Sequence, residues 1–449
     1  MVPVSLVPVS GRALPLASAG TTTIEPADDT EGLGLLGTHS WHDSAVVAAT
    51  LVVMAAGFGQ FGAVAALGQV ARSFGKVTGG VSIADRAGLS GSELGIGLAV
   101  LRLASLGGLP LASLADRFGR RRVMLWTCAG GLLLTVVAAA SPSYWWFVAL
   151  FALGRPFLSA TTAVGQVSAA ELTASANRAR AIAMIAAGYA VGAGTLAIVD
   201  GAASKSLGFR GLFMLSLIPL ALLPLIATRL TEPRRFSIAR STGISPLPVI
   251  GAIESPFRAR LSLVLVLAFA LGVVTGPANS FVFVYAENVR HMAALSTSFM
   301  VVGAGAIGLG GLLVGRYAAD RFGRRITAAS GMIVVAIGGM LAYSGSTPAL
   351  VVGYEVGILA GAVLAPAAGA LVNELFPTSV RASVSGWQVA AGVLGATTGL
   401  VAFGTLADIQ NHFATAAVTT FAPVVLLAFL FYFLPETKGL EPEALWPDR

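Results

Sequence analysis

The stretch LADRFGRR at residues 114–121 returns as AADRFGRR at residues 318–325. A second charged feature follows each copy, because a glutamate precedes an arginine by seven residues at Glu171 and again at Glu374. Both features repeat after about 200 residues, which indicates that the chain is an internal duplication. Each charged stretch lies between long apolar segments. A duplicated and mostly apolar chain of this kind is typical of a secondary transporter.

The composition places the chain in a lipid bilayer rather than in water. Hydrophobic residues make up 56% of the 449 residues and only 11% are charged, whereas soluble domains are about 25% charged. A net charge of +7 would suggest nucleic acid as the partner of a soluble protein. Here the arginines cluster at the ends of apolar segments, where basic residues set membrane topology. We therefore predict the lipid bilayer and a small-molecule substrate as partners, and no nucleic acid.

The sequence predicts neither a metal site nor a bound cofactor. The four histidines are scattered without metal-ligand spacing, and Cys128 is the only cysteine, so an internal disulfide cannot form. The apolar segments carry no nucleophile beside a base, and the chain has no phosphate-binding Gly-Lys-Ser/Thr phrase. We therefore predict that the protein is not an enzyme and that a proton gradient drives it.

Twelve segments are long and apolar enough to cross a bilayer, whose core of about 30 Å needs about 20 residues of helix. In the first half they cover residues 45–72, 92–114, 123–140, 145–169, 179–203 and 211–229. In the second half they cover residues 261–285, 295–317, 326–345, 348–372, 380–405 and 414–434. The predicted fold is therefore an all-α membrane protein in which two six-helix bundles are related by a pseudo-two-fold axis.

The domain limits follow from these segments. We expect a disordered tail at 1–44, a first bundle at 45–229, a polar linker at 230–260, a second bundle at 261–435 and a short tail at 436–449. Most arginines lie in the linker and in the loops that would share its side of the membrane. Because basic loops remain in the cytoplasm, the linker and both termini should be cytoplasmic in a plasma-membrane protein, which we expect to be a monomer.

The repeated stretch resembles a loop of the major facilitator superfamily, which reads Gly-x-Leu-Ala-Asp-Arg-x-Gly-Arg-Arg between helices 2 and 3 and recurs between helices 8 and 9. The first glycine of that pattern is replaced by Ala112 here, and in the second copy it stands one place early, at Gly315. ELFPTSVR at 374–381 and PETKG at 435–439 are similar to phrases of the sugar and organic-acid porters of that family, and TEPRR at 231–235 resembles the phrase after helix 6. The resemblance implies the same twelve-helix fold.

In this family the repeated loop closes the cytoplasmic side in the outward-facing state, and the resemblance implies that role here. The loop arginines can pair with acids such as Glu171 and Glu374, and the carboxylate of Asp116 can meet the partial positive charge of a helix N-terminus. Alternatively, the basic residues serve only to set topology. The expected gating residues are Asp116, Arg117, Gly119, Arg120, Arg121, Glu171, Arg178, Asp320, Arg321, Gly323, Arg324, Arg325, Glu374 and Arg381.

Arg102, Arg155 and Glu355 are the three clear cases of ionisable residues well inside the predicted spans. Such groups are costly in a bilayer and are candidates for function. None has a charged counterpart in the other half, which favours substrate chemistry over shared structure. The family lines its cavity with helices 1, 4, 7 and 10, so the resemblance implies that Arg155 and Glu355 face each other. Because each charge alone is costly there, we expect them to pair in the empty protein and to part when an anion or a proton binds. Alternatively, both arginines are structural and Glu355 is interfacial.

Five neutral polar residues complete the predicted substrate or coupling site, namely Gln60, Gln166, Asn279, Tyr285 and Gln388, although each can instead join helices. Two phrases of related branches are missing: the helix 7 glutamine pair of sugar porters and the helix 5 Gly-Pro-Gly-Gly of drug antiporters. We therefore predict a proton-coupled secondary active transporter of a small organic solute, such as an organic or aromatic acid or a sugar-like metabolite, in which the bundles rock about a central site. The alternatives are a multidrug or metabolite exporter, and a non-transporting membrane sensor of the same fold.

Overall fold

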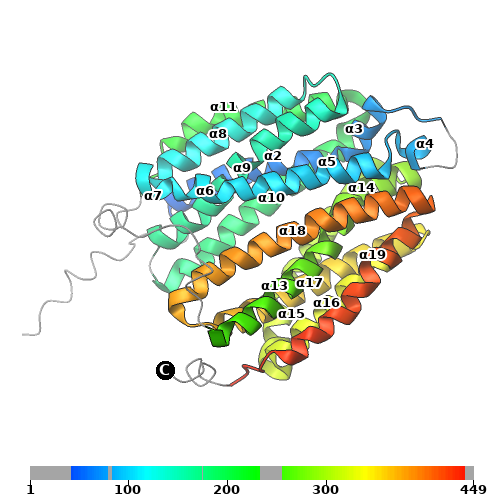
Figure 1. Cartoon of the computed structure of the whole chain (residues 1–449). Coiled ribbons are helices and arrows are strands. Elements are labelled where there is room, and N and C mark those ends of the chain that lie inside the picture. Colours follow the sequence, from blue (N-terminus) through cyan, green and yellow to red (C-terminus); the bar gives the residue numbers. More distant parts are fainter. Residues whose placement is uncertain (1–41, 79–82, 174, 233–254, 440–449) are drawn as a thin grey trace, which may run out of the picture.

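The computed structural model describes residues 42–78, 83–173, 175–232 and 255–439. Helices make up nearly all of this part of the chain (Figure 1). Twelve of the described helical segments are long and apolar enough to cross a membrane, as the sequence predicts. The predicted tail at 1–44 and linker at 230–260 lie mostly outside the described residues, as does the C-terminal tail beyond residue 439.

The first bundle contains the helices from α2 to α11. Its elements are α2 (Ser44–Ala65), α3 (Leu67–Phe74), α4 (Ile83–Ala87), α5 (Gly91–Ala104), α6 (Gly108–Ser113), α7 (Ala115–Phe118), α8 (Arg120–Ala138), α9 (Tyr144–Leu172), α10 (Ser175–Met214) and α11 (Leu217–Ala227). Within α10, Gly208 has a φ of 57°, a left-handed conformation that favours glycine, and it separates two of the predicted spans.

The second bundle repeats this pattern with longer helices. Its elements are α13 (Ser255–Ser280), α14 (Val282–Val284), a π-helical turn (Tyr285–Val289), α15 (Ala294–Phe322), α16 (Arg324–Ala342), α17 (Thr347–Leu375), α18 (Thr378–Gln410), α19 (Phe413–Leu427) and a 3₁₀ turn (Ala428–Phe433). Helix α13 begins six residues before the predicted limit at 261, because the arginine-bearing segment Phe257–Arg260 is already helical.

Two ends of the molecule need names. The linker end is where the loops at Gly119, Thr173 and Gly323 lie, and where residues 228–232 leave α11. The far end is the opposite one, where α3, α4 and the turn Tyr285–Val289 lie. Figure 1 shows α3, α4 and α14 together at one end of the molecule and α7 at the other.

The bundles are packed against each other at the far end. Helices α5 and α18 cross so closely there that a Cβ at Gly404 would lie 2.1 Å from the backbone oxygen of Gly91. Asp408 of α18 accepts hydrogen bonds from the N–H groups of Gly91 (2.7 Å) and Ser92 (2.8 Å), and so places a carboxylate at the N-terminus of α5. Phe61 and Phe283 meet edge to face across the same interface, with ring centroids 6.0 Å apart.

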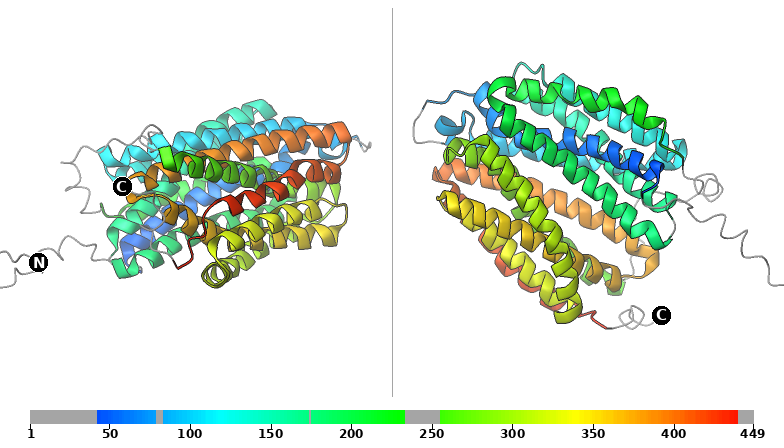
Figure 2. Two further views of the ribbon diagram at one scale, coloured as in Figure 1. Left: turned by 60° about the horizontal axis from the view of Figure 1, so that its bottom comes forward. Right: turned by 180° about the vertical axis from the view of Figure 1, so that it is seen from behind.

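Helices α10 and α15 show where the bundles separate. Near the far end, the Ser298 hydroxyl donates to the carbonyl of Ala197 (2.6 Å). Further along the same face of α15, a Cβ at Gly305 would meet nothing within 4 Å, and Leu309 and Leu313 are exposed. The matching face of α10 becomes exposed as well. The structure is therefore closed at the far end and splayed toward the linker end, as the right-hand view of Figure 2 shows.

Candidate functional site

A cluster of charges holds the first repeated loop together at the linker end. The Arg120 guanidinium binds Asp116 (2.9 Å) and Glu171 (3.0 Å), so the predicted pairing of a loop arginine with Glu171 is confirmed. The Glu232 carboxylate accepts hydrogen bonds from the N–H groups of Arg120 and Arg121, the first two residues of α8. Negative charge at a helix N-terminus is favourable, and Glu232 therefore fixes the chain after α11 to the start of α8.

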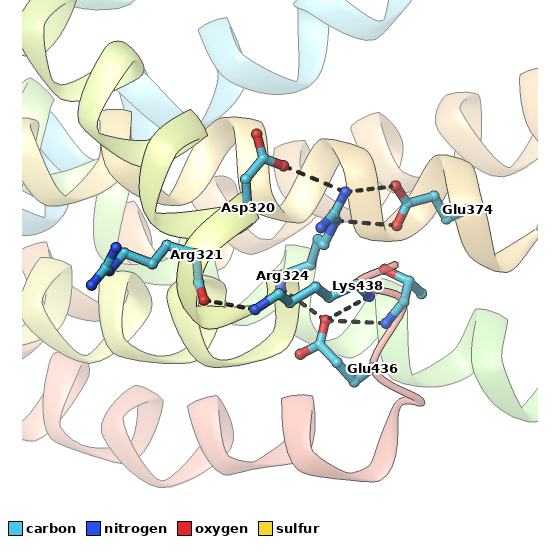
Figure 3. Close-up of polar contacts among 7 residues, drawn as sticks. Asp320, Arg321, Arg324, Glu374, Glu436 and Lys438 are labelled. Carbon is cyan, nitrogen blue, oxygen red and sulfur yellow. Dashed lines mark hydrogen bonds and ion pairs between the residues drawn. The ribbon is translucent and has the colours of Figure 1, made fainter. Parts of the chain in front are cut away.

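The second repeat reproduces this cluster, as Figure 3 shows. Arg324 lies between Asp320 and Glu374, at 3.5 Å from each. The Glu436 carboxylate accepts hydrogen bonds from the N–H groups of Arg324 (2.9 Å) and Arg325 (3.1 Å) at the start of α16. The pairing of a loop arginine with Glu374 is thus also confirmed, and the two repeats use the same acid positions.

The glycine of each repeat is required by this geometry. Gly119 and Gly323 have φ values of 95° and 104°, which side chains rarely adopt. A Cβ at Gly119 would lie 2.9 Å from the Glu232 carboxylate, and one at Gly323 would lie 2.6 Å from that of Glu436. In this structure the carboxylates at the N-termini of α8 and α16 belong to Glu232 and Glu436, while Asp116 binds Arg120. The matching places of both glutamates, just after the last helix of each half, were a usable sequence signal.

The remaining arginines of the predicted gate bind backbone oxygens. Arg178 donates to the carbonyl of Ala170 (3.1 Å) and Arg381 to that of Phe376 (3.3 Å), so each satisfies the C-terminal end of a preceding helix. Arg121 donates to Ala227 (2.9 Å) in the same way. These contacts each stay within one bundle.

Arg325 and Arg321 also have partners within their own bundle. Arg325 donates to the carbonyls of Tyr432 and Leu434, each at 3.3 Å. Arg321 is exposed, donates to the Tyr317 hydroxyl (3.4 Å), and its carbonyl accepts from Lys438, as Figure 3 also shows. Arg117, at the matching place in the first repeat, is exposed as well.

Two arginines lie within the first bundle, near enough to each other for their charges to interact. Arg155 of α9 donates to the backbone oxygen of Gln60 (2.9 Å) on α2, and the Tyr189 hydroxyl of α10 donates to the Gln60 amide oxygen (3.4 Å). Arg102 of α5 lies close enough to Arg155 and Tyr189 for their charges to interact. We call these four residues the arginine patch. Among the described residues neither arginine has an ion-pair partner.

The arginine patch continues along one face of α9. At about 100° per residue, Ser159, Thr162 and Gln166 fall on the same side of the helix as Arg155. Gln166 is exposed and lies nearest the linker end. A polar track therefore runs from the arginine patch toward the end at which the bundles are splayed.

The second bundle offers a cavity at matching depth. It has a volume of about 200 Å³ and is lined by Thr275, Ala278, Asn279, Val335, Gly339, Ala342, Gly353, Tyr354, Gly357, Ile358 and Gly361. Ile358 and Arg155 each stand eleven residues from the far-end start of their helices, which is about 16 Å at 1.5 Å per residue. Asn279 thus borders a cavity that is mostly apolar, and Thr275 and Tyr354 supply its other polar groups.

The expected pair of Arg155 with Glu355 is not formed. Glu355 has no hydrogen bond or ion pair among the described residues. On α17 it lies about 130° around the helix from the face that borders the cavity. On the side of Glu355, Leu359 and Ala362 pack against Gly311 of α15. Glu355 therefore belongs to the α15 side of the helix in this structure.

Two neutral candidates lie away from the arginine patch and the cavity. Tyr285 is buried among the rings of Tyr343 and Phe413, and its hydroxyl donates to the backbone oxygen of Tyr343 (3.3 Å). Gln388 borders a separate cavity of about 40 Å³ that is otherwise apolar and lies within the second bundle. Tyr285 therefore serves packing at the far end, and Gln388 faces α13 and α17.

The sequence predictions include none of four buried polar residues that lie at the far end. Gln69, Asp200, Glu287 and Asn288 are each less than a tenth exposed. Asp200 could have been found, because it is an acid inside the predicted span 179–203. Glu287 directly follows the predicted span 261–285 and reads as a loop residue in the sequence. In the described part of the chain, no group of three or more His, Cys, Asp and Glu residues could hold a metal ion.

Comparisons with known proteins agree with this architecture. The sequence model described as Major Facilitator Superfamily matches residues 49–319 and 308–447. A curated protein of Cupriavidus pinatubonensis, named as a probable 4-methylmuconolactone transporter, is 26% identical over 378 residues, which cover 79% of this chain and 85% of that protein.

Two solved structures show the same fold. The inward open conformation of the xylose transporter XylE from E. coli superposes with a TM-score of 0.66 at 20% identity, over 89% of this chain and 98% of that one. A mutant of the nucleoside transporter NupG superposes with a TM-score of 0.70 at 14% identity, over 87% of this chain and 99% of that one.

Proposed function

The chain belongs to the Major Facilitator Superfamily of transporters, and from this membership we propose that it carries a small organic anion across the plasma membrane. Alternating access would be driven by the proton gradient, without a bound cofactor, in a monomer. The relative named as a transporter of 4-methylmuconolactone supports a small organic metabolite as the substrate.

The observation that carries the anion proposal is the arginine patch. Arg102 and Arg155 lie near enough within the membrane-spanning part for their charges to interact, and no carboxylate of the described residues neutralises either of them. Unpaired charges are costly in surroundings of low dielectric constant, so a bound carboxylate would relieve that cost and accept hydrogen bonds from the guanidinium groups. The mostly apolar cavity of the second bundle would take the rest of the substrate. Two cations in this position disfavour an exporter of cationic drugs.

The splayed linker end supports an orientation of the protein in the membrane, and it disfavours the alternative of a non-transporting sensor. Arg117, Arg122, Arg229 and Arg321 are all exposed at that end, which supports a cytoplasmic linker end by the positive-inside rule. In that orientation the splayed end faces the cytoplasm, which corresponds to an inward-open state. A sensor that does not transport would have no need of bundles that separate at one end.

We expect thiol labelling to establish this orientation. Thr228 is exposed at the linker end and Ser344 at the far end. In a chain whose buried Cys128 is replaced by alanine, Ser344→Cys should react with a membrane-impermeant thiol reagent on intact cells. Thr228→Cys should react only after the membrane is made permeable. Labelling of Thr228→Cys on intact cells would reverse the proposed orientation.

The charge clusters at the linker end would act as gates in the opposite state. Asp116 and Asp320 are about two-thirds exposed although each binds an arginine, so both carboxylates keep free oxygen surface for contacts with the other bundle when the linker end closes. The proposed gating residues are the two repeated stretches together with Glu171, Arg178, Glu374 and Arg381.

The transport proposal is tested with the purified full-length protein in proteoliposomes. Uptake of radiolabelled aliphatic carboxylates, aromatic carboxylates, sugars and cationic dyes is measured with and without an inward proton gradient. We expect accumulation of at least one carboxylate, stimulated by the gradient and abolished by a protonophore. Accumulation of sugars or dyes, with no carboxylate transported, would refute the anion proposal.

A further inference from the structure

Closure of the far end buries an acid from each bundle. Asp200 of α10 is 1% exposed and Glu287, in the π-helical turn Tyr285–Val289, is 7% exposed. Their charges are close enough to interact. We call these two residues the far-end acid pair. Neither acid belongs to the arginine patch or to the charge clusters of the linker end.

Helix α3 brings the far-end acid pair together. The Gln69 side-chain N–H donates to the Asp200 carboxylate, and Arg72 lies 3.6 Å from the Glu287 carboxylate. Residues three apart lie on one face of a helix, so both acids lie along the same face of α3. The Asn288 amide of the second bundle donates to the carbonyls of Gly68 (3.3 Å) and Ala87 (3.4 Å) of the first bundle. The contacts of Glu287 and Asn288 join the two bundles and exist only while the far end is closed, whereas the hydrogen bond from Gln69 to Asp200 lies within the first bundle.

The charges around the far-end acid pair do not balance. Arg72 is the single cation in contact with it among the described residues, and the Arg72 side chain is 44% exposed. Arg290 follows on the same turn as Glu287 and interacts with Tyr285. Two ionised carboxylates with one partly hydrated arginine leave a net negative charge in a dry interface, which opposes closure.

The other charged groups at this end do not correct the imbalance. On α4, Asp85 accepts a hydrogen bond from the Thr78 hydroxyl and Arg86 is exposed. His291 is exposed as well. The part of α15 that packs at this end carries no charged residue before Arg316.

Four buried oxygens in this group have no hydrogen-bond partner among the described residues. They are Oε1 of Gln69, Oδ2 of Asp200, Oε1 of Glu287 and Oδ1 of Asn288. Buried polar atoms without partners are rare and call for a missing ligand. A proton on one carboxylate would remove the excess charge and would also supply a donor for a neighbouring oxygen.

We propose that the far-end acid pair is a proton-binding site, and that one proton bound between Asp200 and Glu287 permits the far end to close. When the far end opens, the two acids part with their bundles, become hydrated and release the proton to the solvent on that side. The site goes beyond the proposed transport of an organic anion, because closure depends on pH whether or not a substrate is bound. For one linked proton, the ratio of closed to open far ends changes by up to about tenfold per pH unit.

The test follows the far end directly, without transport. Spin labels are attached at Ser206→Cys and Ser344→Cys, one exposed far-end position in each bundle, in a chain with Cys128→Ala. Distances in the purified full-length protein are measured by electron paramagnetic resonance from pH 5 to pH 9 at fixed sodium. We expect the short, closed distance to lose population as pH rises.

The variants assign the effect to the acid pair. Asp200→Asn keeps an acceptor for Gln69 but carries no charge. The far end should therefore stay closed across the pH range in this variant, and also in the double variant Asp200→Asn with Glu287→Gln. Asp408→Asn alters another acid between the bundles, and it should keep the pH response of the parent. An unchanged pH response in the double variant, or a response to sodium at constant pH, would overturn the proposal.

If the far end stays closed at every pH, the distance measurement does not test the proton site, and a second measurement is used. Infrared spectra of the closed protein at pH 7 should contain the carbonyl band of a protonated carboxyl group, and the double variant should lack it. Absence of that band from the parent protein would refute the proton site. Transport of an organic anion could still be observed, so the two failures are distinguishable.

Discussion

Replacing Arg155 with alanine should lower carboxylate uptake by about 25-fold or more. Loss of one partner from a desolvated, hydrogen-bonded charge pair costs roughly 2–5 kcal/mol, and each 1.4 kcal/mol is about tenfold in affinity. Arg155 also donates a hydrogen bond to the backbone oxygen of Gln60 in α2. Removing this bond leaves the hydrogen bonds within α2 in place. Substrate binding should therefore fall much further than stability.

The controls separate binding from folding. Arg155→Lys keeps the charge but loses the planar pair of donors, so it should retain part of the uptake. Arg122 is an exposed arginine at the linker end, and Arg122→Ala should transport within about twofold of the parent. Binding is measured by calorimetry and unfolding by melting temperature in detergent. Normal carboxylate affinity in Arg155→Ala would remove the arginine patch from the substrate site.

The fold was predictable because its signals are redundant. Twelve apolar segments, two matching charged loops and a period of about 200 residues all indicate the same pair of bundles. The pairing of loop arginines with Glu171 and Glu374 was also predictable, because acid and arginine recur at one spacing in both halves. The duplication shows which residues of the two halves occupy matching positions. It does not show which acid contacts the N-terminus of a helix. The positions of Glu232 and Glu436 match in the two halves, but their contacts with the N-termini of α8 and α16 are seen only in the structure.

The site was only partly predictable, for reasons of geometry. An ionisable residue in an apolar helix is easily noticed, and Arg102 and Arg155 do come together. The face of the helix on which a residue lies is harder to infer, because a transmembrane helix is apolar all around and shows little periodicity. Glu355 therefore seemed a partner for Arg155 although it lies on the α15 side. Asp200 and Glu287 meet only through contacts between bundles, which a linear pattern does not contain.

A single methyl group at Gly404 should block the transport cycle. Gly404→Ala would place a Cβ 2.1 Å from the Gly91 oxygen. The two backbones are also close at Gly95, where an added Cβ would lie 2.4 Å from the Leu400 oxygen, so α18 has little room to shift along α5. The far end would have to separate. Because alternating access requires both ends to close in turn, we expect uptake to fall by about tenfold or more, and the far-end distance between labels at residues 206 and 344 to lengthen.

The matched control is Gly310→Ala on α15. A Cβ at Gly310 meets nothing within 4 Å, and the residue is exposed. Both substitutions gain the same helix propensity, about 1 kcal/mol, so any difference between them reports the contact of α5 with α18 and not the stability of one helix. Gly310→Ala should transport like the parent and keep the short far-end distance. Equal transport by both variants would mean that α5 and α18 do not need to pack this closely during the cycle, and that the far end closes through α10 and α15 instead.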